Sequence, residues 1–314
     1  MRRVLFFSLL RTTVVVVTVY VGVLAALCLV HRQGRPLVHW FFPELHWKGG
    51  DTWQRYTEFD ALRRSHFDAI VIGSSHAYRG YDPSIFRAHG HSFFNLGSSA
   101  QTPLHSCRIV GEVIDSSNTG LLIFDCYDIM MEADPLEATS DLTMNLPWDR
   151  PAWGMGLAQR DPRGLLLLTV RTLLQHHAPL FTDSTYRAGG YCETTDSLRH
   201  PVHFKPKDRW KPYAGMQESF MALLDLCRER GVPVVLVNHP APSTANRKKH
   251  AAFAEWVRSV AEPRHVPFID LAFDHGLPLS DHDHFYDHNH LNKAGVRIFD
   301  EELIRRLERA GLLH

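Results

Sequence analysis

Two short polar segments near opposite ends of the chain hold residue types that can perform nucleophilic chemistry together. The first is Ser74-Ser75, preceded by Gly73 at the end of the apolar run 69–73. A serine at the sharp exit of a buried strand projects its hydroxyl into the crevice where ligands of open α/β sheets bind. The glycine before it permits the tight backbone path. Taken alone, this segment is also typical of an ordinary turn.

The second segment is Asp287-His288-Asn289-His290, which precedes a helix-forming stretch. An aspartate and a histidine three residues apart allow the carboxylate to orient the imidazole. The other ring nitrogen is then free to take a proton from a serine hydroxyl. The two segments therefore predict a hydroxyl nucleophile with a histidine base.

Buried strands and amphipathic helices alternate over most of the chain and would position these segments. Thr102 and Asp82 each precede a proline, as at a helix N-terminus, and Gly231 stands where a helix ends. The alternation predicts an α/β fold with a doubly wound, mainly parallel sheet. Apolar runs bounded by turn residues predict strands at 69–73, 92–97, 120–126, 232–238 and 266–271. Helices are expected at 83–90, 103–114, 216–230, 243–261 and 293–313.

Together these segments resemble the SGNH/GDSL hydrolase superfamily. In that superfamily a Gly-Asp-Ser-type block follows the first strand, and an Asp-x-x-His block lies near the C-terminus. Gly73-Ser74-Ser75 matches the first block with Ser74 in place of the aspartate, and Asp287-x-x-His290 matches the last. The resemblance covers residues 66–126 and 230–313, and it implies a sheet of the SGNH/flavodoxin-like kind.

The resemblance also implies roles for the residues that match. Ser75 would be the nucleophile, His290 the base and Asp287 its orienter, with an acyl-serine intermediate and neither cofactor nor metal. The backbone N–H groups of Ser75 and Gly97 would form the oxyanion hole, since Asn95-Leu96-Gly97 falls where the family's second block lies. Ser74 is the competing nucleophile. Because neighbouring side chains at a strand exit point in different directions, only one serine can meet His290.

The third block of the family is missing. A Gly-x-Asn-Asp block is expected after the strand that ends near Cys126, and the chain has Asp125-Cys126-Tyr127-Asp128 there. Loss of one oxyanion donor costs a serine hydrolase about two to three orders of magnitude in rate. Membrane-anchored relatives that move acetyl or D-alanyl groups onto cell-surface polymers also depart from the standard blocks. The departure therefore favours acyl transfer.

The N-terminus carries an uncharged apolar run at 12–30, which is long enough to cross the hydrocarbon core of a bilayer. Three arginines precede it (Arg2, Arg3 and Arg11), which favours a cytoplasmic N-terminus and an extracytoplasmic main domain. The competing interpretation is a cleaved signal peptide. The run is longer than the apolar core of a signal peptide, and no A-x-A site follows it. We therefore expect a single-pass membrane anchor.

The predicted organisation has three parts. Residues 1–31 form a cytoplasmic tip and anchor, and residues 32–65 a juxtamembrane connector. Residues 66–314 form the SGNH-like domain, with a helical or irregular insertion at about 128–211 where strand–helix alternation breaks down.

Composition excludes several classes. Lys+Arg and Asp+Glu both number 34, so no basic excess indicates nucleic acid. The five cysteines lack paired C-x-x-C spacing, although one disulfide outside the cytoplasm stays open. Residues 281–284 (Asp-His-Asp-His) could ligate zinc, but no spaced third ligand set accompanies them, and a solvated loop is the preferred interpretation.

The sequence thus predicts a membrane-anchored serine esterase or O-acyltransferase that uses no cofactor. Its expected substrate is an acylated carbohydrate or cell-envelope polymer, and a membrane O-acyltransferase is a candidate partner. The non-enzyme alternative is a catalytically degenerate envelope scaffold, which the missing third block favours.

Overall fold

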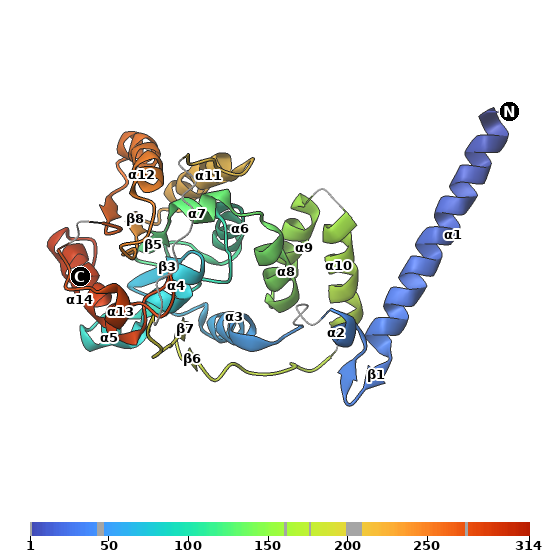
Figure 1. The fold of residues 1–314 in the computed structure, drawn as a ribbon, viewed down its shortest axis with the longest axis horizontal. Helices are drawn as coiled ribbons and strands as arrows, with labels where there is room; N and C mark the ends of the chain where they lie inside the picture. Colours follow the sequence, from blue (N-terminus) through green and yellow to red (C-terminus); the bar gives the residue numbers. More distant parts are fainter. Residues whose placement is uncertain (1, 43–46, 160–161, 176, 199–208, 274–275) are drawn as a thin grey trace.

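A five-stranded sheet forms the centre of the protein (Figure 1). The computed structural model describes residues 2–42, 47–159, 162–175, 177–198, 209–273 and 276–314. The strand order is β4-β3-β5-β8-β9, and every neighbouring pair is parallel. This confirms the predicted α/β fold with a mainly parallel sheet. The strands are β3 (Ala69–Ile72), β4 (Phe93–Asn95), β5 (Leu122–Asp125), β8 (Val234–Asn238) and β9 (Phe268–Asp270).

Helices connect the strands and also precede the sheet. In chain order the helices before β5 are α1 (Arg2–Leu29), α2 (Val38–Phe41), α3 (Gly50–Leu62), α4 (Ser75–Gly80), α5 (Pro83–Ala88) and α6 (Pro103–Val113). Those after β5 are α7 (Asp128–Glu132), α8 (Leu136–Asn145), α9 (Asp149–Ala158), α10 (Pro162–Leu174), α11 (Met216–Glu229), α12 (Arg247–Ala261), α13 (Asp281–His284) and α14 (Lys293–Arg309). Two short antiparallel pairs complete the elements: β1 (His31–Arg32) with β2 (Arg35–Pro36), and β6 (Tyr186–Arg187) with β7 (Tyr191–Cys192).

Each face of the sheet is covered by its own set of helices (Figure 1). Side chains alternate along a strand, so Ile70 and Ile72 of β3 pack on one face with α6, α11 and α12. Ala69 and Val71 point to the opposite face, where α5 and α14 cover them. Because both faces of the sheet are covered, the interior strand β3 is apolar throughout, as is usual for strands of parallel sheets.

The helix ends follow the local signals in the sequence. The Asp82 carboxylate accepts the Ser84 N–H at 2.8 Å with Pro83 in the first turn of α5. The Asn292 side chain accepts the N–H groups of Ala294 and Gly295 and so caps α14. Gly231, which follows the C-cap residue of α11, has φ of +67°, a conformation that glycine adopts without strain.

Two regions have more regular structure than expected. Helix α3 lies within the expected connector, yet its Tyr56 and Phe59 are fully buried in the cluster that covers the sheet. Residues 50–62 are therefore part of the domain core. The insertion, expected to be helical or irregular, holds helices α7 to α10 and the β6–β7 pair. All five cysteines are free thiols, so the disulfide left open above is not formed.

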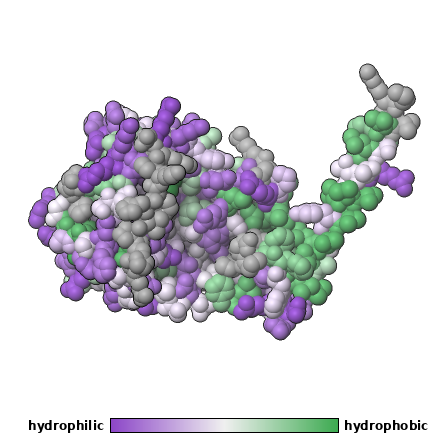
Figure 2. Space-filling model, in the orientation of Figure 1, coloured by the Kyte–Doolittle hydropathy of each residue, from purple (hydrophilic) through white to green (hydrophobic). Residues whose placement is uncertain are grey.

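Helix α1 projects away from the rest of the protein, and hydrophobic residues cover it (Figures 1 and 2). Residues Leu5–Leu29 are long and apolar enough to cross a membrane. Near its C-terminal end, Leu24 and Cys28 pack against Leu167 and Val170 of α10. This apolar helix is a candidate membrane anchor or signal sequence.

Candidate active site

Ser75 is the first residue of α4, directly beyond the carboxyl end of β3. The turn between them is tight, because a Cβ atom on Gly73 would lie 2.8 Å from the backbone oxygen of Asp125 on the neighbouring strand. Only glycine allows this approach. The turn places the Ser75 hydroxyl above the sheet, where it is partly accessible to solvent.

The structure brings the Ser75, His290 and Asp287 side chains together. His290 Nε2 lies 2.7 Å from Ser75 Oγ. On the other side of the ring, His290 Nδ1 lies 2.9 Å and 3.0 Å from the two carboxylate oxygens of Asp287. These distances are within hydrogen-bond reach for a nucleophile, its base and the group that orients the base.

Asp287 is held in its ionised form. Its Oδ1 accepts the backbone N–H groups of Asn289 and His290, each at 2.8 Å. Partial burial opposes ionisation, but His290 and the two backbone N–H groups outweigh it and hold the pKa of Asp287 well below its usual range. An ionised carboxylate here favours the tautomer in which His290 Nδ1 carries the proton and Nε2 is free to accept one.

Two further residues lie next to the base: Tyr286 contacts His290, and Arg79 contacts Tyr286. The Tyr286 ring stacks on His290 with centroids 5.4 Å apart and an angle of 15°. The Arg79 guanidinium lies 5.3 Å from the centre of the Tyr286 ring, and its Nε donates to Tyr78 Oη at 3.0 Å. Sequence reasoning missed both residues. The available signal was that Arg79 follows Ser75 by four residues, which places them on one face of a helix.

The neighbouring Ser74 points in a different direction from Ser75. Its hydroxyl is fully buried and donates to Tyr127 Oη at 3.1 Å. Ser75 alone of the two meets His290, so the geometry agrees with the choice of Ser75 over Ser74.

One of the two N–H donors of the predicted oxyanion hole, that of Gly97, is engaged in another hydrogen bond. Gly97 does pack against α4, because a Cβ on it would lie 2.6 Å from the Tyr78 backbone nitrogen. However, its N–H already donates to Asn95 Oδ1 at 3.0 Å. The Asn95 amide is anchored in turn by donating to the backbone oxygens of Ala77 and Tyr81. The expectation of a free Gly97 N–H is therefore not met, because the Asn95 side chain turns back onto it. The Ser75 N–H, at the start of α4, has no acceptor within its own helix.

Tyr127 occupies the place of the missing third block. It follows β5, and its ring stacks on His76 with centroids 3.9 Å apart. Its hydroxyl accepts from Ser74, so the hydroxyl proton of Tyr127 itself can be donated elsewhere. Asp125, in the same block, is fully buried and accepts the Tyr81 hydroxyl at 2.6 Å. Burial raises the pKa of Asp125 to about 7.

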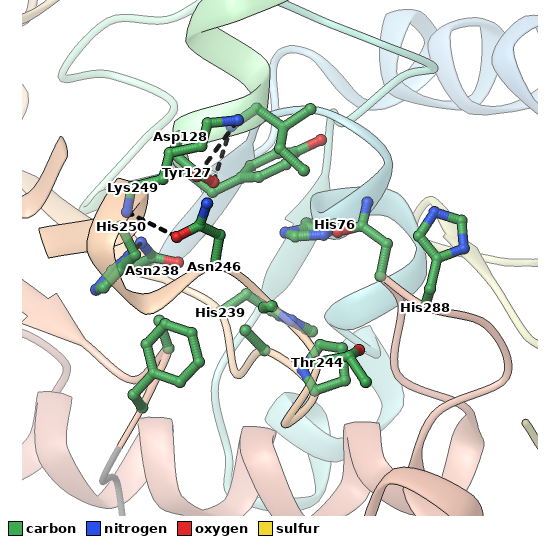
Figure 3. Close-up of a pocket in the computed structure, with 17 residues that line it drawn as sticks. His76, Tyr127, Asp128, Asn238, His239, Thr244, Asn246, Lys249, His250 and His288 are labelled. Atoms are coloured by element: carbon green, nitrogen blue, oxygen red, sulfur yellow. Dashed lines mark hydrogen bonds and ion pairs between the residues drawn. The ribbon is translucent and has the colours of Figure 1, made fainter. Parts of the chain in front are cut away.

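A cavity of about 290 Å³ adjoins the base loop (Figure 3). At one end His76, His239 and His288 lie together, and at the other Lys249 contacts Asp128. Burial lowers the pKa of His76 to about 3, and it lowers the pKa of His239 well below its usual range. Both imidazoles are therefore neutral, and no group of three or more metal-ligating side chains occurs among the residues that the structure describes.

Residues 194–298, about a third of the chain, match the GDSL-like Lipase/Acylhydrolase family. The match includes Asp287 and His290, whereas Ser75 lies outside it. No curated protein matches the chain.

Solved structures of similar fold have low sequence identity to this chain. They include AlinE4, an SGNH-hydrolase family esterase (15% identity, 78% of this chain and 94% of that one, TM-score 0.32). A Desulfitobacterium hafniense protein assigned to the G-D-S-L lipolytic family is 13% identical (76% of this chain and 98% of that one, TM-score 0.39). A Streptococcus pneumonia protein described as a platelet activating factor is 12% identical (86% and 96%, TM-score 0.45). The family match confirms, over residues 194–298, the resemblance to SGNH/GDSL hydrolases seen in the sequence.

Proposed function

We propose that the protein is a serine esterase or O-acyltransferase that acts on an acylated carbohydrate or cell-envelope polymer. The observation that carries this proposal is the contact of 2.7 Å between Ser75 Oγ and His290 Nε2, with Asp287 on the other ring nitrogen. This arrangement activates a serine hydroxyl for attack on an acyl carbon.

The reaction follows from these three side chains. Ser75 Oγ attacks the carbonyl carbon of the ester while its proton passes to His290 Nε2, and Asp287 stabilises the imidazolium. The tetrahedral intermediate then collapses to an acyl-serine, and His290 returns the proton to the departing sugar oxygen. Water or a second sugar hydroxyl next attacks the acyl-serine while its proton passes to His290. The second tetrahedral intermediate then collapses, His290 returns the proton to Ser75 Oγ, and the acyl group stays on the new oxygen.

The Tyr127 hydroxyl takes the role of the missing third-block amide in this proposal. It lies beside the nucleophile turn, bound to Ser74, and it retains a proton to donate to the oxyanion. Together with the Ser75 N–H it would supply two donors. A site with a weakened oxyanion hole reacts slowly with water, whereas a bound sugar hydroxyl gains several kcal/mol from correct orientation. This difference favours transfer over hydrolysis.

The proposal places the main domain outside the cytoplasm, with α1 as a single-pass anchor. Its support is the length and apolar surface of α1, together with the arginines that precede its apolar run. A membrane O-acyltransferase is the proposed partner. Its test is co-purification of the two proteins from detergent-solubilised membranes.

Covalent capture tests the enzyme directly. A fluorophosphonate should label the wild-type chain at Ser75, and Ser75→Ala should abolish the labelling. Incubation with an activated acetyl ester and an oligosaccharide should yield acetylated sugar, detected by mass spectrometry. Rapid hydrolysis without acetylated sugar would favour a plain esterase.

A catalytically degenerate scaffold is the second candidate, and one observation favours it. The Gly97 N–H is occupied by Asn95, so this donor of the expected oxyanion hole is not presented. Absence of any fluorophosphonate labelling in folded protein would support the scaffold.

A further inference from the structure

A second cavity, of about 760 Å³, lies between α3, α8 and α10. We call it the α3–α8 groove. None of the roles proposed so far uses it. It is lined by Phe42, Gly49, Gly50, Asp51, Thr52, Tyr78, Ser99, Leu136, Glu137, Ser140, Asp141, Arg163, Leu166, Leu167, Phe181 and Asp183.

One end of the groove reaches the elements that hold the nucleophile. Tyr78 belongs to α4, one helical turn beyond Ser75. Ser99 follows the loop in which Gly97 packs against α4 and the Ser98 N–H donates to the Gly73 backbone oxygen at 3.2 Å. This end of the groove is therefore formed by the helix that begins with Ser75 and by the loop packed against that helix.

The other end is apolar and lies beside the base of α1. Phe42, Leu166, Leu167 and Phe181 line it. Leu167 packs in one cluster with Leu24 and Cys28, which both belong to the apolar span Leu5–Leu29. Figure 1 shows α10 and α2 next to the base of α1, and Figure 2 shows that the hydrophobic surface of α1 continues onto the neighbouring part of the domain. If α1 crosses a bilayer, this end of the groove lies at the membrane surface.

The wall of the groove is rich in carboxylates. Asp51, Glu137, Asp141 and Asp183 line it, against the single guanidinium of Arg163 among the described lining residues. The Ser99 hydroxyl donates to Glu137 at 2.8 Å, and the Thr52 hydroxyl donates to Asp141 at 2.7 Å. Glu137 and Asp141 thus already accept hydroxyl groups, whereas Asp51 is paired with the buried Arg55 at 2.9 Å. Because carboxylates accept hydrogen bonds and repel anions, the wall suits a neutral head group with many hydroxyls.

We propose that the α3–α8 groove binds a neutral glycolipid. Its sugar hydroxyls would donate to the carboxylates, its acyl or alkyl tail would leave past Phe42 and Leu166 toward the bilayer, and an ester on the sugar would reach Ser75. This inference rests on the proposed function, because it names the carbohydrate substrate of the same nucleophile.

The test uses full-length protein in detergent micelles and a blocking substitution in the groove. Ser140 lies on α8 and lines the groove, so Ser140→Trp fills it without touching Ser75, His290 or Asp287. We expect kcat/KM for acetylated dodecyl glucoside to fall about tenfold or more, as for loss of a buried binding contact. Hydrolysis of 4-nitrophenyl acetate, which is too small to need the groove, should change less than about twofold. Ala252→Trp, at an exposed position of α12 outside the groove, is the matched control and should change neither rate.

Two substrate analogues separate the contributions of tail and charge. Acetylated methyl glucoside lacks the tail, and acetylated dodecyl glucuronide keeps the tail but adds a negative charge. Both should react less efficiently than acetylated dodecyl glucoside. Preference for the glucuronide would overturn the charge argument, and equal rates with the methyl glucoside would overturn the role of the apolar end. Equal losses of Ser140→Trp on the glycolipid and on 4-nitrophenyl acetate would also refute the groove.

A binding readout keeps this inference separate from the proposed chemistry. A photoreactive dodecyl glucoside should crosslink to peptides containing Leu166 or Phe181 in the Ser75→Ala protein, and Ser140→Trp should suppress the crosslinks. Crosslinks without esterase activity would support glycolipid binding in the groove and refute the proposed reaction. Esterase activity without crosslinks would support the proposed reaction and refute glycolipid binding in the groove.

Discussion

Replacing Asp287 by asparagine is the most direct perturbation of the candidate site. Asparagine has the same shape, and its oxygen can still accept the N–H groups of Asn289 and His290 that Asp287 accepts at 2.8 Å. The loop geometry should therefore survive. What changes is the group that faces His290 Nδ1, which becomes an amide N–H in place of a carboxylate oxygen at 2.9 Å.

The expected loss can be estimated from this geometry. Two unit charges about 4 Å apart attract by about 4 kcal/mol at an effective dielectric constant of about 20. Each 1.36 kcal/mol corresponds to about a tenfold change in rate, so losing this stabilisation of the imidazolium costs about three orders of magnitude. The amide would also stabilise the tautomer with its proton on Nε2, which cannot accept the Ser75 proton. We therefore expect kcat/KM of Asp287→Asn to fall about 10³- to 10⁴-fold.

The assay is steady-state hydrolysis of an activated acetyl ester, with the rate of fluorophosphonate labelling as a second readout. Both should fall by similar factors, because both depend on deprotonation of Ser75. Thermal unfolding provides the control and should show a nearly unchanged midpoint. A variant that unfolds normally and loses less than about tenfold in either rate would refute the role of Asp287 as the orienter of the base.

Four further outcomes follow from individual contacts. Ser74→Ala should keep activity within about tenfold, since its hydroxyl is buried on Tyr127 and contributes about 1 kcal/mol to stability; complete loss of labelling in this variant would reverse the assignment to Ser75. Tyr127→Phe should lower kcat/KM about 10²- to 10³-fold if its hydroxyl binds the oxyanion, whereas unchanged kinetics would exclude that role. Because folding raises the pKa of Asp125 to about 7, the native protein retains a proton that the unfolded chain releases near pH 4, so stability falls as the pH rises through this window. Melting curves of Asp125→Asn should lack this part of the pH dependence, and an unchanged slope between pH 4 and 8 would contradict the assignment. A reporter fused to the C-terminus should be active outside the cytoplasm, and the fusion should resist carbonate extraction; a cytoplasmic signal would remove the envelope substrate.

Local sequence was sufficient for the features that depend on near neighbours in the chain. The all-buried strand β3 and the caps at Asp82 and Asn292 follow from hydrophobic runs and from side chains that bind N–H groups two or three residues away. The Asp287 to His290 spacing also determined a local contact, because three residues bring the carboxylate to the ring. The resemblance to SGNH/GDSL hydrolases added the pairing of this segment with Ser75.

Other features were decided by contacts between distant segments. Ser75 and His290 are 215 residues apart, and only the sheet order brings their loops to one edge. Helix α3 also depends on a distant segment. Its Tyr56 is buried in the core, and the Tyr56 hydroxyl donates to the backbone oxygen of Leu96. Tyr56 and Leu96 are 40 residues apart in the chain, so no local pattern predicts this contact.

The oxyanion hole is the clearest example of a feature that the sequence alone could not determine. The sequence by itself determined that Gly97 follows a strand beside the nucleophile, because strand runs and glycine turns are local patterns. Whether its N–H is presented to a ligand depends on the rotamer of Asn95, which is set by the Ala77 and Tyr81 backbone oxygens on a different element. A hydrogen bond between side chain and backbone across two elements has no signature in composition or spacing, since its energy depends on distances that exist only after packing.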